Sequence, residues 1–294
     1  MIPPMKRLFD VDWTPQIPFS AEEFPQVIRD IAVGKMSLSG VQPKASIVLN
    51  QKTKYIEIAQ GNGTHILKPT PAEYPELAEI EDLCMSLAEH LEMDVPPHAV
   101  LPMADGVSAY VVKRFDRLPD GSKLHKEDMA QLLELPSTAK YEASLEKVGK
   151  AIRRWCSHAF LDLINFYERV LFNFVIGNGD MHLKNWALLT LPQPEGRFIR
   201  LAPCYDFVSS RLYIPNDDES ALTIHGRRNR IQRSDFEALA HYLELDAKAA
   251  ASAMEKIVSS EKQLLEGVKP APLSAPRKEA LLTLISSRIH RLRG

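Results

Sequence analysis

Two short stretches of the chain, residues 178–185 and 205–207, contain side chains whose types and spacing suit phosphoryl transfer. Asp180 is followed five positions later by Asn185, and 21 positions after that by Asp206. In kinases, a first aspartate accepts the proton of the substrate hydroxyl, while an asparagine and a second aspartate hold Mg²⁺ against the phosphates of ATP. Asp180 alone could be an ordinary turn residue after a helix. The three together predict a catalytic base, Asp180, and two Mg²⁺ ligands, Asn185 and Asp206.

A lysine and a glutamate earlier in the chain could grip the phosphates of ATP. Lys68 ends an apolar stretch typical of a strand, and residues 75–93 have the three- and four-residue apolar spacing of a helix. Glu81 lies on or beside the apolar stripe of that helix, where a buried carboxylate would need a positive partner. We expect Lys68 and Glu81 to pair at the ATP site. The alternative is a surface lysine and a glutamate at the edge of the stripe.

Weaker candidates for nucleotide contacts lie in three other places. The segment 37–44, with serines and a glycine, could bring backbone N–H groups to phosphates, although a polar lead-in to the first strand is the bland alternative. The strand end near residue 115 corresponds, by order along the chain, to the hinge that binds adenine in kinases; a plain strand end is the competing interpretation. The third place is the stretch 178–185, where His182 could instead orient a neighbouring group and Lys184 could instead be a solvated loop charge. The residues predicted to contact ATP besides Lys68 and Glu81 are Ser39, Gly40, Val41, Gln42, Lys113, Phe115, His182 and Lys184.

The elements that must position these residues follow a simple order. Strands are expected at 45–49, 55–59, 65–68, 99–102 and 108–115, with the helix 75–93 between the third and the fourth. Helices are expected at 126–135, 143–158, 160–176, 234–245, 247–266 and 275–293, with a β-hairpin at 186–191 and 197–202. Residues 1–30 have many prolines and no assigned element. This order predicts an α+β, two-lobed kinase-like fold: a small β-rich N-lobe (1–115), a larger helical C-lobe (116–294), and nucleotide between them.

Composition narrows the function classes. The 294 residues are 45% hydrophobic and 25% charged, with a net charge of −2, so nothing in the overall balance favours direct binding to nucleic acid. Three widely spaced cysteines without a CxxC pair argue against a disulfide framework or a zinc site. No apolar run is long enough to span a membrane, and no Sec-type leader is expected. A bacterial cytoplasmic location is expected, with export by another route left open.

The ordered motifs resemble those of the HipA family of bacterial serine/threonine kinase toxins. They are the segments 37–44, 65–68, 81–96, 112–117, 125–129, 140–142, 179–185, 201–206 and 221–231. The resemblance implies ATP and Mg²⁺ as cofactors, with Asp180 as base, Asn185 and Asp206 at the metal and Lys68 at the phosphates. It also implies autophosphorylation of Ser37, with Ser39 as a second candidate. Phosphate there should lower activity, because its charge would repel that of ATP.

Two features of the chain differ from HipA itself and resemble the short HipT type of the same family. Only 36 residues precede the loop, and Ser39 is a second serine within it. HipA proper has an additional N-terminal subdomain. In the HipT type a separate small HipS-like protein takes its place, and a DNA-binding HipB-like protein completes the complex. The resemblance implies a toxin of a toxin–antitoxin system that phosphorylates an aminoacyl-tRNA synthetase and thereby inhibits translation. A small-molecule kinase of similar fold and a nucleotide-binding pseudokinase scaffold remain as alternatives.

Overall fold

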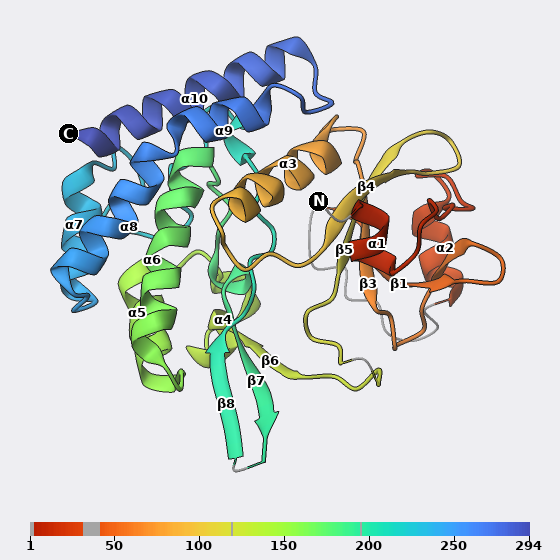
Figure 1. Ribbon diagram of the computed structural model, residues 1–294, viewed down its shortest axis with the longest axis horizontal. Helices are drawn as coiled ribbons and strands as arrows, with labels where there is room; N and C mark the ends of the chain where they lie inside the picture. The colour runs from red at the N-terminus through yellow and green to blue at the C-terminus, as the bar shows by residue number, and fades with distance from the viewer. Residues whose placement is uncertain (1–2, 32–41, 119, 195) are drawn as a thin grey trace. The chain divides into compact units, whose positions relative to one another are not determined.

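The computed structural model describes residues 3–31, 42–118, 120–194 and 196–294 (Figure 1). The chain forms two compact units. The sheet unit contains residues Met1–Asp82 and Pro96–Lys123, and the helical unit contains Leu83–Val95 and Leu124–Gly294. The predicted α+β class, with a sheet-rich region followed by a mostly helical one, is confirmed.

The sheet unit is built on five antiparallel strands in the order β2-β1-β3-β5-β4. These are β1 (Ala45–Asn50), β2 (Tyr55–Ile58), β3 (His65–Pro69), β4 (His98–Pro102) and β5 (Ser108–Lys113). All five lie within two residues of their predicted bounds, because each is a short apolar run closed by turn residues. β3 lies in the middle of the sheet, with Lys68 directly opposite Tyr110 of β5. The lysine is therefore fixed by a strand that is paired on both edges.

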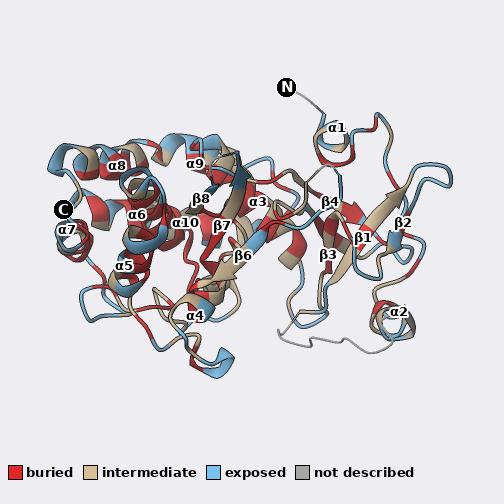
Figure 2. Ribbon diagram, turned by 90° about the horizontal axis from the view of Figure 1, so that it is seen from below, coloured by how far each residue is buried: buried red, intermediate tan, exposed pale blue. Residues whose placement is uncertain are grey.

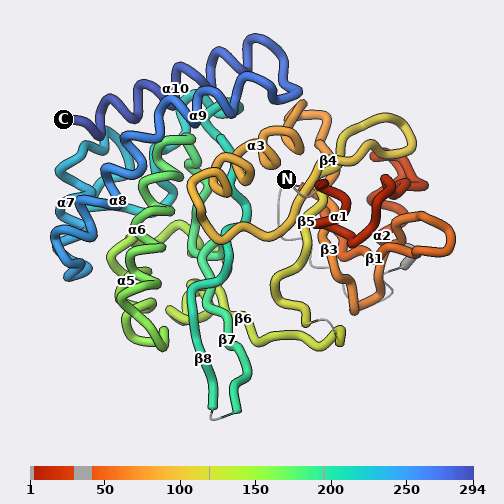
Figure 3. The backbone as a smooth tube through the Cα atoms, viewed as in Figure 1, coloured from red at the N-terminus to blue at the C-terminus, as the bar shows by residue number. Residues whose placement is uncertain are grey.

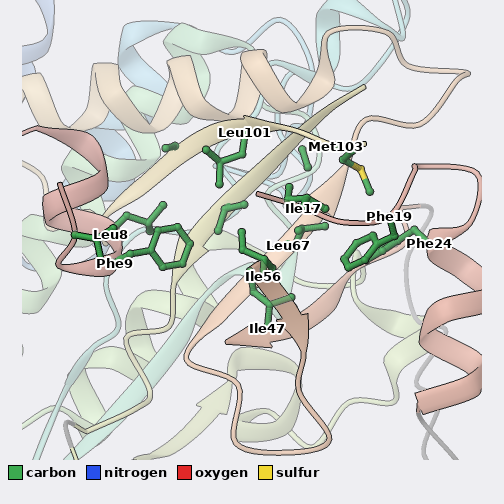
Figure 4. Packing of buried hydrophobic residues seen from close by; sticks show 14 residues of the cluster. Leu8, Phe9, Ile17, Phe19, Phe24, Ile47, Ile56, Leu67, Leu101 and Met103 are labelled. Carbon is green, nitrogen blue, oxygen red and sulfur yellow. The ribbon is translucent and has the colours of Figure 1, made fainter. Parts of the chain in front are cut away.

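The first 30 residues contribute much of the core of this unit. Two short helices, α1 (Pro4–Phe9) and α2 (Phe24–Ile31), flank an irregular segment. Figure 4 shows the apolar side chains that this segment places against the sheet; the labelled members of the cluster are Leu8, Phe9, Ile17, Phe19, Phe24, Ile47, Ile56, Leu67, Leu101 and Met103. The sequence predicts no element here because the two helices are only six and eight residues long and the chain between them is irregular.

The helix α3 (Leu77–His90) is divided between the two units after Asp82. Its second half packs within the helical unit, where Gln263 donates a hydrogen bond to the His90 carbonyl at 2.9 Å. Residues 116–123 fall in the sheet unit. The division therefore differs from the predicted boundary at residue 115. The physical reason is that the chain crosses between the units more than once, which element order alone does not reveal.

The helical unit surrounds α6 (Ala159–Ile176), in which every residue of the last two turns, 169–176, is buried. It packs against α5 (Leu145–Trp155), α8 (Ala247–Ser259) and α10 (Ala275–Arg293), and Figure 2 shows buried residues along these helices. The unit also contains α7 (Arg233–Tyr242) and α9 (Glu261–Val268). The predicted single helix 247–266 is wrong: it ends before Ser260, whose hydroxyl donates to the Ile257 carbonyl at 2.7 Å, and α9 then begins.

A second, three-stranded sheet lies within the helical unit, in the order β6-β7-β8. The predicted hairpin is confirmed as β7 (Ala187–Gln193) and β8 (Gly196–Leu201), which Figure 3 traces as two long adjacent arms. The predicted helix 126–135 is wrong in its first part, since β6 (His125–Asp128) pairs with β7. The helix α4 (Met129–Leu132) starts only after Asp128, which accepts from the Gln131 N–H in a capping box.

Two further observations concern the cysteines and the length of the helices. All three cysteines are buried and free. Among the helices in the described ranges, none combines the length and the apolar character that crossing a membrane would require.

Candidate active site

The predicted catalytic loop begins where α6 ends, in the helical unit. Gly177 closes the helix with a φ of 70°, a left-handed conformation that suits glycine. Its N–H donates to the Phe174 carbonyl at 3.2 Å, and the Asn178 N–H donates to the Asn173 carbonyl at 2.9 Å. This closure turns the chain sharply, so that Asp180 is partly exposed while the three residues before it are buried.

Gly179 is required by close packing rather than by its backbone angles. A Cβ at this position would lie 2.4 Å from the Asp217 carboxylate and 2.4 Å from the Asp218 carbonyl oxygen. The Gly179 N–H donates to the Ser210 hydroxyl at 2.8 Å, and that hydroxyl donates to Asp217 at 2.5 Å. The segment after Asp206 thus braces the chain immediately before Asp180.

Asn185 is tied to the backbone of Asp180. Its Nδ2 donates to the Asp180 carbonyl at 3.1 Å, and the short turn Leu183–Asn185 returns the chain toward this point. The His182 N–H donates to the same carbonyl at 2.8 Å. Because the amide nitrogen of Asn185 is directed at a carbonyl, its Oδ1 is the atom that remains for a cation.

Asp206 has an unusual backbone conformation, with a φ of 56° in a residue other than glycine. Its carbonyl accepts a hydrogen bond from the Asn178 side chain at 3.3 Å. The neighbouring Tyr205 hydroxyl donates to the Lys184 carbonyl at 2.9 Å. The structure thus joins the segments that carry Asp180, Asn185 and Asp206.

His182 and Lys184, two of the predicted ATP contacts, have different surroundings. His182 is buried, and its Nδ1 has no hydrogen-bond partner among the residues that the structure describes. Burial lowers the pKa of His182, which favours the neutral imidazole. Lys184 is partly exposed, and its ammonium donates to the Ser137 hydroxyl at 3.2 Å. Their contacts with nucleotide stay predictions.

The sequence analysis missed one close neighbour of the predicted base. The Tyr141 hydroxyl donates a hydrogen bond to the Oδ1 of Asp180. Burial of the phenol and its contact with Asp180 raise the pKa of Tyr141, so the hydroxyl keeps its proton. Tyr141 precedes Asp180 by 39 positions. No local pattern links residues so far apart, and only the position of Tyr141 within the 140–142 motif drew attention to it.

In the sheet unit, Lys68 and Glu81 form the predicted ion pair. The Lys68 ammonium lies 2.6 Å from the Glu81 Oε1, and the two residues are only 7% and 4% exposed. The ammonium also lies 5.7 Å from the centre of the Tyr110 ring. The pairing is confirmed; the role of Lys68 in holding phosphate stays a prediction.

The other predicted contacts in the sheet unit are described only in part. The Gln42 side chain donates to the Pro69 carbonyl at 2.9 Å, directly after Lys68. Ser37, Ser39, Gly40 and Val41 lie outside the described residues. Around the predicted hinge, the exposed Lys113 donates its N–H to the Pro97 carbonyl at 2.8 Å, and Phe115 is partly buried.

A charged cluster that the sequence analysis did not single out follows this strand end. Asp116 is 6% exposed and accepts two hydrogen bonds of 2.8 Å from Arg114 and one of 2.9 Å from Arg117. Paired, planar contacts of this kind fix geometry strongly. They hold rigid the segment predicted to contact adenine.

The donor set suits Mg²⁺ better than a transition metal. Across the four described ranges, no three side chains from histidine, cysteine, aspartate and glutamate gather closely enough to hold a metal ion. Mg²⁺ requires fewer protein ligands, since it binds through one or two carboxylates together with substrate phosphates and water. The Asp206 carboxylate and the Asn185 Oδ1 are hard oxygen donors of this kind. A Mg²⁺ ion here would therefore depend on bound nucleotide for part of its coordination.

Comparison with known proteins agrees with this geometry. The family described as the HipA-like C-terminal domain matches residues 36–264. A putative kinase from Haemophilus influenzae is 30% identical over 212 residues, covering 68% of this chain and 60% of that protein. The serine/threonine-protein kinase toxin HipA of Shewanella oneidensis is 27% identical over 235 residues, covering 70% of this chain and 53% of that protein.

A solved structure extends the match to almost the whole chain. It is the HipA of a Shewanella oneidensis toxin–antitoxin complex with HipB and operator DNA. The TM-score is 0.75 at 25% identity, and the match covers 97% of this chain and 73% of that chain. The fold is therefore kinase-like, as predicted. The chain spans about half of the length of the curated relatives that it matches. On the evidence of the family match, this chain belongs to the family with a HipA-like C-terminal domain.

Proposed function

We propose that this chain is an ATP- and Mg²⁺-dependent serine/threonine protein kinase. The observation that carries the proposal is the buried Lys68–Glu81 pair at 2.6 Å. Removing two charges from water is costly, and a buried pair of this kind is a poor source of stability. A strand lysine held by a helix glutamate is the arrangement that kinases need to engage the phosphates of ATP. The pair is therefore better explained by phosphate binding than by folding.

Each residue of the candidate site then has a role that its surroundings support. Lys68, oriented by Glu81, would contact the phosphates, and Asn185 and Asp206 would hold Mg²⁺. Bound Mg²⁺ neutralises charge on the phosphates and orients them. Asp180 would orient the substrate hydroxyl and accept its proton as the bond to phosphorus forms and ADP leaves. The partial exposure of Asp180 supports this role, because a base must be reachable by a protein substrate.

The names of the relatives extend the proposal to biological context. A related protein is named a serine/threonine-protein kinase toxin, and the matched HipA structure contains HipB and operator DNA. We infer that this chain is the toxin of a toxin–antitoxin system. Its partners would be a DNA-binding HipB-like protein and a small HipS-like subunit. Its substrate would be an aminoacyl-tRNA synthetase in the bacterial cytoplasm, and it would phosphorylate its own loop at Ser37 and Ser39.

Transfer of radiolabelled phosphate from ATP to the chain itself and to purified synthetases tests the activity. Asp180→Asn should lower the rate of transfer at least about 100-fold, because the base is lost. The midpoint of thermal unfolding should change little. Asp120→Asn, at an exposed loop position of the sheet unit, is the matched control and should keep the parent rate. Equal rates for Asp180→Asn and the parent would remove Asp180 from the mechanism.

The substrate class requires its own measurement. The parent and Asp180→Asn should be incubated with a panel of purified aminoacyl-tRNA synthetases and, separately, with small hydroxyl compounds. Labelling of one synthetase by the parent alone supports the proposed target. Labelling of small compounds alone would replace the protein kinase by a small-molecule kinase.

A further inference from the structure

Tyr141 donates a hydrogen bond to Asp180, yet the proposed function gives Tyr141 no role. The phenol donates to Oδ1, one of the two oxygens of the carboxylate that the proposed reaction uses as its base. Tyr141 lies in the helical unit between the short turn Ser137–Ala139 and α5, and it is partly exposed. Its hydroxyl therefore contacts Asp180 from a segment that is separate from the loop after α6.

The ring of Tyr141 is held in place from two sides. The ring of His182 contacts it edge-on, with 5.2 Å between the ring centroids. The Lys140 ammonium lies over the ring, 4.9 Å from its centre. Both contacts restrict rotation of the phenol. The orientation of the hydroxyl toward Asp180 is thus built into the packing around the ring.

The backbone at Tyr141 is equally fixed. The Leu183 N–H, in the loop that carries Asp180, donates to the Lys140 carbonyl at 3.0 Å. The Arg228 guanidinium donates to the Tyr141 carbonyl, and its other terminal nitrogen lies 3.7 Å from Asp218. The segment around Tyr141 is therefore tied both to the predicted catalytic loop and to the basic loop at residues 226–230.

A carboxylate with one oxygen occupied still has a second one available. An aspartate side chain can rotate about two bonds, and a general base works only when its oxygen lies within hydrogen-bond reach of the substrate proton. Holding Oδ1 restricts that rotation and leaves Oδ2 for the substrate hydroxyl. The raised pKa of Tyr141 means that the phenol remains a donor throughout and takes no part in the transfer of the proton.

We propose that Tyr141 is a positioning residue that holds the Asp180 carboxylate ready to accept the proton of the substrate hydroxyl. This inference rests on the proposed kinase function. Tyr141 adds no chemical step: the substrate proton still goes to Asp180, and the phenol keeps its own. Arg228 supports the same arrangement through the backbone of Tyr141.

The kinetic test compares three variants in phosphate transfer from radiolabelled ATP. Tyr141→Phe keeps the ring packing and removes the hydroxyl. It should lower the maximal rate about tenfold while the ATP concentration for half-maximal rate stays the same. Arg228→Gln should cause a smaller loss, about threefold. Tyr242→Phe, at a tyrosine that is 45% exposed on α7, is the control and should match the parent. An unchanged or higher maximal rate for Tyr141→Phe would overturn the proposal.

A second measurement needs no activity. In protein labelled with ¹³C at the tyrosine Cζ, the Tyr141 signal, identified by its absence in Tyr141→Phe, should shift when Asp180 is replaced by alanine. If the signal does not move, the contact does not exist in solution and the positioning proposal fails. If the signal moves but the parent protein transfers no phosphate, the proposed kinase function fails, and a catalytic purpose for Tyr141 fails with it.

Discussion

The Lys68–Glu81 pair and the Asp180 loop solve different physical problems within their own units. The pair is a contact between two side chains, both more than nine-tenths buried, supplied by β3 and α3. The Asp180 loop is held mainly through backbone groups, with a carboxylate that stays partly exposed. A lysine that binds phosphate, such as Lys68, can stay buried and paired until nucleotide binds. A base must instead be held still and yet be accessible.

This difference predicts how much stability each unit loses when a functional side chain is replaced. Removing one partner of a buried ion pair leaves the other charged and desolvated, which costs about 3–5 kcal/mol. Removing a partly exposed carboxylate leaves its neighbours in contact with water, which costs far less. Substitutions at Lys68 should therefore lower both activity and stability, whereas substitutions at Asp180 should lower activity alone.

The largest effect is expected from Lys68→Met. Glu81 would stay buried without its closest cation, so the free energy of unfolding should fall by about 3 kcal/mol. Phosphate transfer should also be lost. The double variant Lys68→Met/Glu81→Leu removes both charges and should recover most of the stability, but none of the activity. Urea unfolding of the parent and the two variants, each with its transfer rate, measures both properties.

The double variant is the informative member of this series. If it is as unstable as Lys68→Met, the pair contributes to folding through packing, and the argument that it is retained for phosphate binding loses its support. Recovery of stability together with activity would remove Lys68 from the mechanism.

The same contrast explains what the sequence could and could not predict. Lys68 and Glu81 were paired from sequence because each lies in a periodic element, and a glutamate on an apolar stripe needs a partner. Asp180, Asn185 and Asp206 were recognised from spacing. Tyr141 was given no role, because its contact with Asp180 joins two irregular segments 39 positions apart.

Errors in the predicted elements have equally specific causes. The stretch 126–135 contains helix-forming residues, yet its first three residues add a strand to β7, and Asp128 delays the helix by capping it. Pairing with residues 59 to 65 positions away overrode local preference. In the N-terminal segment, Ile17 and Phe19 enter the core from irregular chain, without a period that sequence analysis could detect.

A smaller effect is expected from Gly179→Ala in the helical unit. The new Cβ would meet the Asp217 carboxylate and the Asp218 backbone, and the backbone cannot simply rotate away. The free energy of unfolding should fall by about 1–3 kcal/mol. Phosphate transfer should fall more than this loss of stability explains, since Asp180 is the next residue. Thermal unfolding and transfer rates measure the two effects.

Gly267→Ala is a matched control for this substitution. Its Cβ would lie 2.6 Å from the end of the Leu87 side chain and 3.8 Å from the His90 Nδ1, with no backbone atom in the way, in a helix where alanine is preferred over glycine. It should therefore be nearly neutral for stability and for activity. If both variants are neutral, the bracing of the Asp180 loop by the Asp217 segment is weaker than the packing suggests.

The smallest predicted effect is a loss of stability in mild acid that originates on the same strand as Lys68. Burial lowers the pKa of His65 from 6.5 to about 4, although its Nε2 lies 2.7 Å from the Leu8 carbonyl, a contact that opposes this shift because the charged ring also donates. Between pH 4 and 6.5 the unfolded chain binds more protons at this histidine than the folded chain, so stability falls as the pH falls through this window. At pH 5.5 the loss should be about 1 kcal/mol relative to pH 8.

His65→Gln isolates this contribution, because the amide can still donate to the Leu8 carbonyl but does not titrate. Urea unfolding at pH 8 and pH 5.5 should give a difference about 1 kcal/mol smaller for His65→Gln than for the parent. Equal differences would mean that His65 is protonated in the folded state or already neutral in the unfolded one. With the predicted result, mild acid would lower stability by protonating His65 in the unfolded chain, while the folded chain keeps the neutral ring on β3.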